Sequence, residues 1–353
     1  MTSVRKALDR HDFASLARAA LGPARTLTAA DRLRGGSKKG VYRLTFDDDS
    51  TAIAYVWSED EDFWPASAPA AASDASAGTA DAPAAATDHR APFSHASGID
   101  LFNASYARLT ALGIRTPRLL FGDRTHTHLP ADVAVVEDVR GGSLEDLLNR
   151  DPAAAATALR ELAEALQIMR GHRAPGFGKV ALVDNGGVSH GTSCADVVRD
   201  RALADLAEAA ARDARIAAVS EALHERLLAL AAAVRPRSRH TLIHGELGPD
   251  HVLVDDDGHP VLIDIEGLMY FDAEWEHVFL RLRFQDHYEA LRADGLDADR
   301  LRLYRPAMHL SLVAGPLRLL DGDFPDPGFM RGIAEYNLQQ TVMCLENPSS
   351  RVP

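Results

Sequence analysis

The chain has 353 residues, 46% of them hydrophobic, and a formal net charge of -13 from 38 basic and 51 acidic side chains. This length is enough for one large domain or two lobes with a substantial core, and it excludes a small disulfide-held scaffold. Cys194 and Cys344 are the two cysteines and lie far apart in the sequence, which favours reduced thiols and a cytoplasmic protein. The acidic balance argues against a nucleic-acid partner, since such a partner requires a basic face.

The sequence carries no membrane or export signal. Charged residues interrupt the first 21 positions, so the apolar centre of a signal peptide is missing, and no apolar run is long enough to span a bilayer. We therefore expect no membrane association, and the oligomeric state has no sequence signal. Lysine occurs only at positions 6, 38, 39 and 179, and arginine supplies the remaining positive charge.

The first part of the chain predicts a helix followed by hairpins. Apolar residues recur at helical spacing over residues 3–21, and Gly22 and Pro23 end the pattern. From Leu33 onward, short β-type runs at 33–34, 41–46 and 52–57 flank a Gly-rich segment at 35–40 and an Asp-rich turn. This alternation is typical of an antiparallel sheet.

A low-complexity segment interrupts this region. Between residues 66 and 88 every residue is Ala, Ser, Pro, Asp, Gly or Thr. Such a composition offers too little large apolar surface to offset the entropy of ordering. We predict a disordered insertion over about 66–92.

The remainder alternates briefly and then becomes helical. We predict a helix at 99–112, strands at 118–121 and 133–136, and a helix N-terminus at Ser143, whose capping partner is Asp146. Helical patterns follow at about 152–171, 195–234 with a break, 299–319 and 328–345. The predicted fold class is α+β, with a sheet-rich N-terminal lobe (1–140) and a larger helical C-terminal lobe (141–353).

Polar residues that carry chemistry gather between residues 242 and 266. Apolar runs at 252–254 and 261–263 flank a polar loop and predict a hairpin. A symmetric register pairs Val254 with Val261 and places His251 opposite Asp264. Glu246 comes just before the hairpin and Glu266 just after it, so these groups converge. Oxygen-rich ligands around Mg²⁺ and a separate carboxylate for an acceptor hydroxyl are what a metal-nucleotide site requires.

These residues resemble the catalytic and metal-binding loops of the aminoglycoside phosphotransferase family, relatives of choline and fructosamine kinases with a protein-kinase-like fold. The family motif is H-G-D-x-x-x-x-N, followed about a dozen residues later by D-x-D or D-x-E. The chain has His244-Gly245-Glu246, then His251, and then Asp264-Ile265-Glu266. Glu246 replaces the family's Asp, and His251 replaces the usual Asn, as it does in macrolide phosphotransferases.

The resemblance implies a role for each residue of the site. ATP would lie between the lobes, against the backbone of Glu137 to Val139 and against the Gly-rich segment Gly35, Gly36, Ser37, Lys38, Lys39 and Gly40. Asp264 would bind Mg²⁺ together with His251 and Glu266, and the imidazole makes Mn²⁺ a further candidate. In the catalytic loop, Glu246 would be the base and His244 would brace the loop. Glu276 matches a family carboxylate that also braces this loop, or else belongs to an acidic helix N-terminus.

The N-terminal lobe departs from the family. The strand at 52–57 lacks the phosphate-contacting lysine, and the helix at 99–112 lacks its glutamate partner; Tyr55 and Ser105 stand at these positions. Loss of both is self-consistent, because either one alone in a cleft would be costly. Lys38 or Lys39 is the candidate replacement, with Arg43 less favoured.

Three functions fit this sequence. The leading one is an ATP-dependent phosphotransferase that acts on a hydroxyl of a small molecule, such as an antibiotic or other natural product. The negative net charge would favour a cationic acceptor. The alternatives are a kinase-like enzyme that phosphorylates Ser or Thr of a peptide in a modifying complex, and a pseudokinase-like module that binds a nucleotide or a partner.

Overall fold

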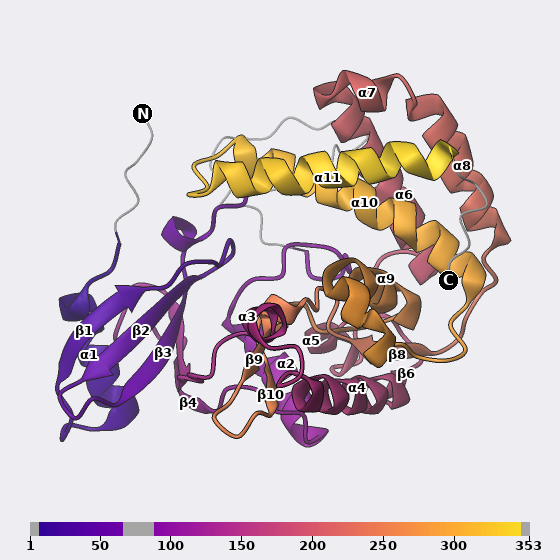
Figure 1. The fold of residues 1–353 in the computed structure, drawn as a ribbon. Helices are drawn as coiled ribbons and strands as arrows, with labels where there is room; N and C mark the ends of the chain where they lie inside the picture. The colour runs from indigo at the N-terminus through magenta and orange to yellow at the C-terminus, as the bar shows by residue number, and fades with distance from the viewer. Residues whose placement is uncertain (1–6, 66–87, 347–353) are drawn as a thin grey trace.

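The computed structural model describes residues 7–65 and 88–346 and confirms the α+β fold class (Figure 1). The N-terminal lobe is built on an antiparallel five-stranded sheet in the order β1-β2-β3-β5-β4. These strands are β1 (Leu27–Arg32), β2 (Gly40–Phe46), β3 (Thr51–Trp57), β4 (Leu119–Asp123) and β5 (Asp132–Glu137). Two helices, α1 (Arg10–Leu21) and α2 (Ile99–Ala111), pack on this sheet, and a short 3₁₀ turn, η1 (Glu59–Glu61), follows β3.

The period-two alternation of β3 separates two cores. Ala52, Ala54 and Val56 face α1, whereas Ile53, Tyr55 and Trp57 lie in the cluster that includes α2 residues such as Phe102. Successive side chains of a strand point to opposite faces of its sheet, so an almost wholly apolar strand is expected where helices cover both faces.

The C-terminal lobe is mainly helical, and α10 and α11 lie side by side along its edge (Figure 1). Its helices are α3 (Leu144–Arg150), α4 (Ala156–Gly171), α5 (Val180–Val183), α6 (Cys194–Arg212), α7 (Ala214–Ala217), α8 (Ser220–Ala233), α9 (Ala273–Phe284), α10 (Ala298–Leu320) and α11 (Pro327–Glu346). Shorter 3₁₀ turns are η2 (Pro249–His251), η3 (Ile265–Gly267) and η4 (Gln285–Ala290).

Two small sheets lie within this lobe and position the polar loops. One contains β6 (Arg173–Ala174), β8 (His240–Ile243), β11 (Met269–Phe271) and β7 (Gly178–Lys179) in that spatial order. The other is the hairpin of β9 (Val252–Val254) and β10 (Pro260–Leu262). The loops that follow β8 and β10 carry the predicted catalytic and metal-binding residues.

Several local predictions are confirmed and others are wrong at particular residues. Ser143 caps α3 by accepting the N–H of Asp146, as expected. The helix predicted over 3–21 begins at Arg10 within the described residues, because Asp9 and Asp12 form a capping box there, and residues 3–6 lie outside the described part of the chain. Strand β1 was not predicted, and residues 33–34 are not in a strand; the weakly apolar stretch 27–32 pairs with β2 along its edge.

The predicted insertion falls mostly outside the described residues. Residues 66–87 of this insertion lie outside the described residues. Residues 88–92 are described and contact the C-terminal lobe, because the N–H of His190 donates to the carbonyl of Arg90 at 2.8 Å. Among the described helices, none has the length and apolar character needed to cross a membrane.

Candidate active site

The Gly-rich segment brings two lysines from the N-terminal lobe onto the loops of the C-terminal lobe. Gly36 has φ of +76°, and a Cβ there would lie 2.7 Å from the carbonyl oxygen of Lys39, so this turn requires glycine. Ser37 is held by Phe63, whose N–H donates to the Ser37 carbonyl at 2.9 Å, and by Trp64, whose Nε1 donates to its Oγ at 2.9 Å. Lys38 and Lys39 follow this anchored turn, and each contacts a carboxylate of the C-terminal lobe.

Lys39 forms the central contact between the lobes. Its Nζ donates to Asp264 Oδ1 at 2.8 Å and to Glu266 Oε1 at 2.5 Å, and only 7% of its side chain is exposed. The same ammonium lies 5.0 Å from the ring centroid of Tyr55, the residue that stands where the family carries lysine. Burial opposes the charge on Lys39, but the two carboxylates outweigh it and raise its pKa.

The conformation and surroundings of the two carboxylates that contact Lys39 favour binding of a cation. Asp264 has a left-handed backbone, with φ of 57°, at the point where the chain leaves β10. Burial disfavours its charge, but the ammonium of Lys39 and the ring of His251 hold its pKa well below the ordinary value. Glu266 Oε1 also accepts Trp57 Nε1 at 3.3 Å, while its Oε2 is buried and has no hydrogen-bond partner among the described residues.

The catalytic loop presents Glu246 and His251 beside Asp264. The Glu246 side chain is 58% exposed and accepts Lys38 Nζ at 3.3 Å; the charge of Lys38 lowers the pKa of this carboxyl. His251 donates its Nδ1 hydrogen to the Glu246 carbonyl at 2.7 Å. Its Nε2 faces Asp264 Oδ2 at 3.7 Å and lies 3.8 Å from Asp250 Oδ2, and in the neutral ring this nitrogen can act as a metal ligand.

His244 and Glu276 hold this loop in place through hydrogen bonds to backbone groups. His244 is buried, and its Nε2 donates to the Ile263 carbonyl at 2.9 Å; burial, together with the charge of His251, lowers its pKa to about 4. Glu276 on α9 accepts the Gly245 N–H at 2.7 Å, and burial raises its pKa to about 7. These contacts favour a bracing role for both side chains over proton transfer by His244 or a solvated acidic cluster.

The hairpin that carries the metal-binding residues has a different register from the predicted one. Val254 pairs with Pro260 and Val261 pairs with Leu253, so the symmetric register was wrong by one residue. The N–H of Ile263, rather than a group of Asp264, donates to the His251 backbone carbonyl at 3.0 Å. His251 and Asp264 still meet through their side chains because Asp264 turns back in its left-handed conformation.

The segment predicted to contact adenine joins the two lobes. Glu137 ends β5, and its carboxylate receives Arg115 Nη2 at 2.7 Å, while the Val139 side chain is buried. Arg43 is not directed at the metal-binding carboxylates, because its Nε donates to Asp138 at 2.8 Å. Of the three candidate cations, Lys39 and Lys38 therefore reach the site and Arg43 does not.

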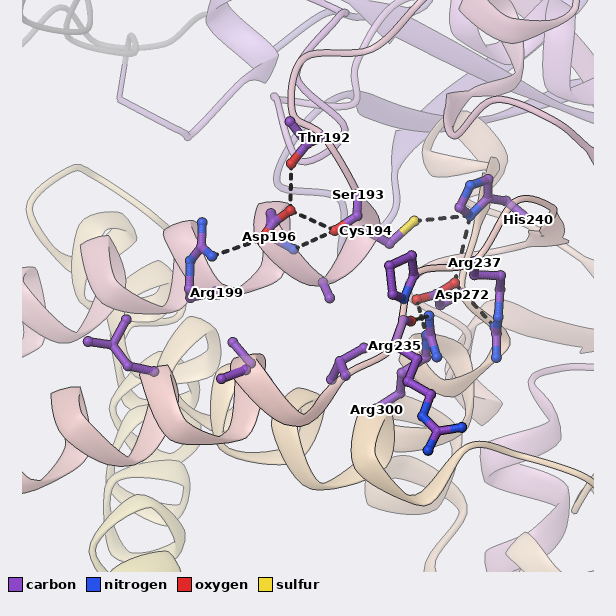
Figure 2. A pocket seen from close by; sticks show the side chains of 16 residues that line it. Thr192, Ser193, Cys194, Asp196, Arg199, Arg235, Arg237, His240, Asp272 and Arg300 are labelled. Carbon is purple, nitrogen blue, oxygen red and sulfur yellow. Dashed lines mark hydrogen bonds and ion pairs between the residues drawn. The ribbon is translucent and has the colours of Figure 1, made fainter.

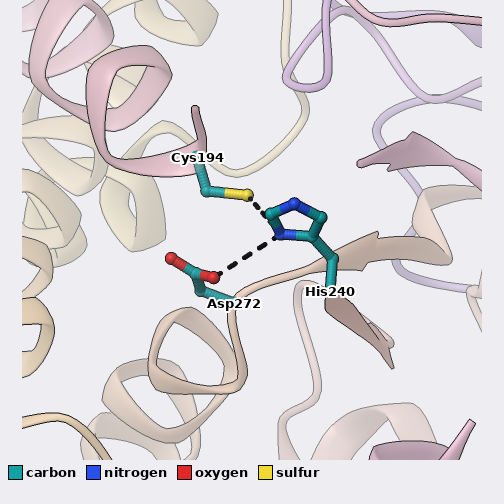
Figure 3. A group of neighbouring side chains, drawn as sticks. All are labelled: Cys194, His240 and Asp272. Atoms are coloured by element: carbon teal, nitrogen blue, oxygen red, sulfur yellow. Dashed lines mark hydrogen bonds and ion pairs between the residues drawn. The ribbon is translucent and has the colours of Figure 1, made fainter. Parts of the chain in front are cut away.

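A second polar cluster, which the sequence did not reveal, lies beside a pocket of about 490 Å³ in the C-terminal lobe (Figure 2). Cys194, His240 and Asp272 place one ligand atom each within 4.8 Å of one another (Figure 3). Cys194 Sγ is 3.3 Å from His240 Nδ1, which is 3.7 Å from Asp272 Oδ1. The three residues are separated by more than 30 positions in the sequence, so no spacing motif announces them.

Cations and hydroxyl groups of the protein already surround Asp272 in this second cluster. Its carboxylate accepts Arg300 Nε at 2.8 Å, Arg237 Nη1 at 3.2 Å and the Tyr304 hydroxyl at 2.5 Å. Burial raises the pKa of Cys194 well above its ordinary value, which favours the neutral thiol over the nucleophilic thiolate. These contacts indicate a structural hub rather than a metal centre or a catalytic triad.

Comparison with known proteins identifies one matching family and several solved structures of similar fold. The model of the family described as "Phosphotransferase enzyme family" (APH) matches residues 75–310. No curated protein sequence matches this chain significantly.

The solved structures that resemble this chain share few identical residues with it, but the similarity covers most of the length of both chains. A thermostable mutant of aminoglycoside phosphotransferase APH(4)-Ia, in its apo form, is 16% identical over 89% of this chain and 95% of its own, with a TM-score of 0.56. Spectinomycin phosphotransferase APH(9)-Ia, in complex with ADP and spectinomycin, is 11% identical over 97% and 99%, with a TM-score of 0.62. LicA in complex with AMP is 11% identical over 95% and 98%, with a TM-score of 0.57. At these identities the likeness establishes the fold.

Proposed function

Since the chain belongs to the phosphotransferase enzyme family and is a kinase with an alcohol group as acceptor, we propose that it transfers the γ-phosphate of ATP to a hydroxyl of a small molecule. One observation carries the proposal. Lys39 of the Gly-rich segment is held between Asp264 and Glu266, and Lys38 contacts Glu246. Cations that can meet phosphate oxygens therefore lie directly against carboxylates that can hold a metal and a hydroxyl.

The residues present fit a divalent cation. Asp264 and Glu266 supply carboxylate oxygens, one of them buried and without a hydrogen-bond partner among the described residues, and the neutral ring of His251 would offer its Nε2. The ammonium of Lys39 lies between the two carboxylates, so this position already accepts a positive charge. Asp264, His251 and Glu266 would hold Mg²⁺ or Mn²⁺, and the bound ion neutralises phosphate charge.

The other side chains take the remaining tasks. In this proposal Lys39 contacts the phosphates of ATP in place of the lysine that β3 lacks. Glu246 is exposed at the side of the site open to an acceptor, where it orients the hydroxyl and accepts its proton. Glu276 and His244 hold the loop that carries Glu246. Most of the rate enhancement would come from positioning and charge neutralisation.

The proposal is tested with the purified full chain. Mg-ATP and Mn-ATP are titrated while the thermal unfolding midpoint is recorded, and transfer to a panel of hydroxyl compounds is then measured. We expect Asp264→Ala to abolish the nucleotide-dependent shift, and Glu246→Gln to retain the shift and lose transfer. Absence of nucleotide binding to the wild type would contradict the proposal and favour a pseudokinase-like module.

A second outcome separates small-molecule from peptide acceptors. The structure of spectinomycin phosphotransferase holds ADP and an antibiotic in a chain of the same fold, which supports a small molecule here. Transfer that occurs only to a Ser or Thr peptide, or only with an added partner protein, would favour the peptide-modifying alternative.

A further inference from the structure

The lysine that reaches the metal-binding carboxylates lies in a turn and not in a strand. Lys39 directly precedes β2, and the turn before it contains Gly35 and Gly36, with φ of +93° and +76°. Glycine has more backbone freedom than any other residue, so such a turn is ordered only where other groups hold it. The contacts that hold this turn therefore decide where the Lys39 ammonium lies.

Two segments of the chain hold this turn through side-chain donors. Trp64 Nε1 donates to Ser37 Oγ at 2.9 Å, beside the bond from the Phe63 N–H to the Ser37 carbonyl. Ser97 Oγ donates to the carbonyl of Lys38 at 2.8 Å. Each of the two residues before Lys39 is thus fixed by a side chain from outside the Gly-rich segment.

Trp64 and Phe63 are themselves packed on the C-terminal lobe. A Cβ at Gly315 of α10 would lie 3.4 Å from the Trp64 ring, so this ring contacts the helix backbone. The Phe63 ring packs edge-on against Phe324, in the connection between α10 and α11, with 5.6 Å between the centroids. The turn that carries Lys39 is therefore anchored on the same lobe as the metal-binding carboxylates.

The same segment also holds the two strands that flank the turn. Glu61 is buried, and its carboxylate accepts Arg32 Nη2 of β1 at 2.9 Å and the hydroxyl of Tyr42 in β2. A Cβ at Gly40 would lie 2.5 Å from Glu61 Cδ, so the segment packs directly on the start of β2. Residues 61–64 thus connect the whole Gly-rich hairpin to α10 and to the connection that follows it.

On the basis of the proposed function, we propose that Trp64 and Ser97 are positioning residues, which hold the Gly-rich turn so that the Lys39 ammonium can meet the phosphates of ATP. β3 and α2 lack the lysine and the glutamate that would hold each other as an ion pair. Neutral hydrogen bonds from Trp64 and Ser97 take over that positional task for a lysine in a turn. Both residues act through Lys39, so their removal matters for the nucleotide only while Lys39 is present.

The test uses the full chain and two readouts. Calorimetry gives the dissociation constant of Mg-AMP-PNP, and backbone hydrogen exchange over residues 35–40 is followed in the nucleotide-free chain. The variants are Trp64→Phe, which keeps an aromatic ring and loses the Nε1 donor, and Ser97→Ala, each alone and combined with Lys39→Ala. Ser220→Ala is the matched control, because Ser220 Oγ donates to the Ala217 carbonyl at 3.0 Å, a bond of the same kind within the helical lobe.

We expect Trp64→Phe and Ser97→Ala each to raise the dissociation constant about fivefold and to speed hydrogen exchange over 35–40, because each removes one hydrogen bond that orders the turn. In the Lys39→Ala background the same substitutions should change the constant less than about twofold. Ser220→Ala should change neither readout.

Unchanged exchange, unchanged affinity, or a loss of affinity that persists in the Lys39→Ala background overturns the positioning role and leaves the proposed function standing. If Lys39→Ala no longer binds the nucleotide, exchange and affinity in the two single variants decide. Failure of the wild type to bind Mg-AMP-PNP overturns the proposed function and the positioning role with it.

Discussion

The clusters around Asp264 and around Asp272 both bury carboxylates beside cations, and they differ in what those cations are and where they are attached. Asp264 and Glu266 receive the flexible ammonium of Lys39, which comes from a loop of the other lobe. Asp272 receives the planar guanidinium groups of Arg237 and Arg300 and a tyrosine hydroxyl, all within the helical lobe.

The difference teaches how to distinguish a functional acidic cluster from a structural one. Around Asp272 the lone pairs of the carboxylate are occupied by rigid donors, so a ligand would have to displace several strong bonds. Around Asp264 the occupying cation is a single lysine on a Gly-rich turn, and one buried oxygen of Glu266 has no partner among the described residues. A cluster that can exchange its cation is suited to binding and catalysis.

The largest effect should come from Asp264→Ala. Removing the carboxylate that anchors the metal site should lower the rate of phosphate transfer about 100- to 1,000-fold and abolish the thermal shift with Mg-ATP. Asp257→Ala is the matched control, because Asp257 is an exposed carboxylate in the turn of the β9–β10 hairpin that leads to Asp264. Equal losses in both variants would contradict a special role for Asp264.

The opposite pattern is expected at the structural cluster. Asp272→Ala removes the buried carboxylate that pairs with Arg300 Nε and leaves this buried guanidinium with Asp297 alone, and should lower the free energy of unfolding by about 3–5 kcal/mol. Urea unfolding measures this change. Asp299→Ala, which removes an exposed pair with Arg302, should change stability by less than about 1 kcal/mol. A similar small change in both variants would show that the Asp272 cluster is not a structural hub.

Substitutions of the two lysines of the Gly-rich segment should differ in their effect on nucleotide binding. Lys39→Ala removes a buried charged contact and should raise the KM for ATP about 10- to 100-fold. Lys38→Ala removes a more exposed pair with Glu246 and should change it less than about fivefold. If the double variant keeps the wild-type KM and rate, these lysines do not replace the one missing from β3.

Lys179 provides a comparison through pH. Burial and the charge of Lys38 lower its pKa to about 8 in the folded protein, from 10.5 in the free side chain. Between these pH values the unfolded chain holds more protons, so the free energy of unfolding should rise with pH by about 3 kcal/mol through this group. Urea unfolding from pH 7.5 to 10.5 should show this gain in the wild type and not in Lys179→Met. Parallel profiles would show that the ammonium is not held in a low-polarity site.

The smallest effect should come from Cys194→Ala. The thiol is buried beside His240, and its loss should lower the free energy of unfolding by about 1 kcal/mol and leave phosphate transfer unchanged. Adding Zn²⁺ should not raise the unfolding temperature of the wild type, because Arg237 and Arg300 already occupy Asp272. A zinc-dependent rise that Cys194→Ala abolishes would reveal a metal site where we infer a hub.

Local sequence patterns predicted much of the fold because they report on local physics. The β-type runs of β2 and β3, the cap at Ser143 and the helical pattern at 299–319 all correspond to elements of the structure. Strand β1 escaped prediction because its stability comes from pairing with β2 and not from its own composition. The hairpin register was wrong because the turn geometry at residues 255–259, rather than symmetry, sets the pairing.

For the candidate site, the sequence alone predicted which residues belong to it. The order and spacing of His244, Glu246, His251, Asp264 and Glu266 identified the loops, and the scarcity of lysine restricted the replacement cation to Lys38, Lys39 or an arginine. Only the tertiary structure decided among these cations, because Arg43 pairs with Asp138, whereas the Lys39 ammonium contacts Asp264 of the other lobe.

Tertiary structure alone also brought Ser97 to the carbonyl of Lys38 and brought Cys194, His240 and Asp272 together. These contacts join residues that are dozens to hundreds of positions apart, and their formation depends on how helices and sheets pack. Spacing along the chain specifies a loop, whereas the charge that surrounds a loop is set by every element packed against it.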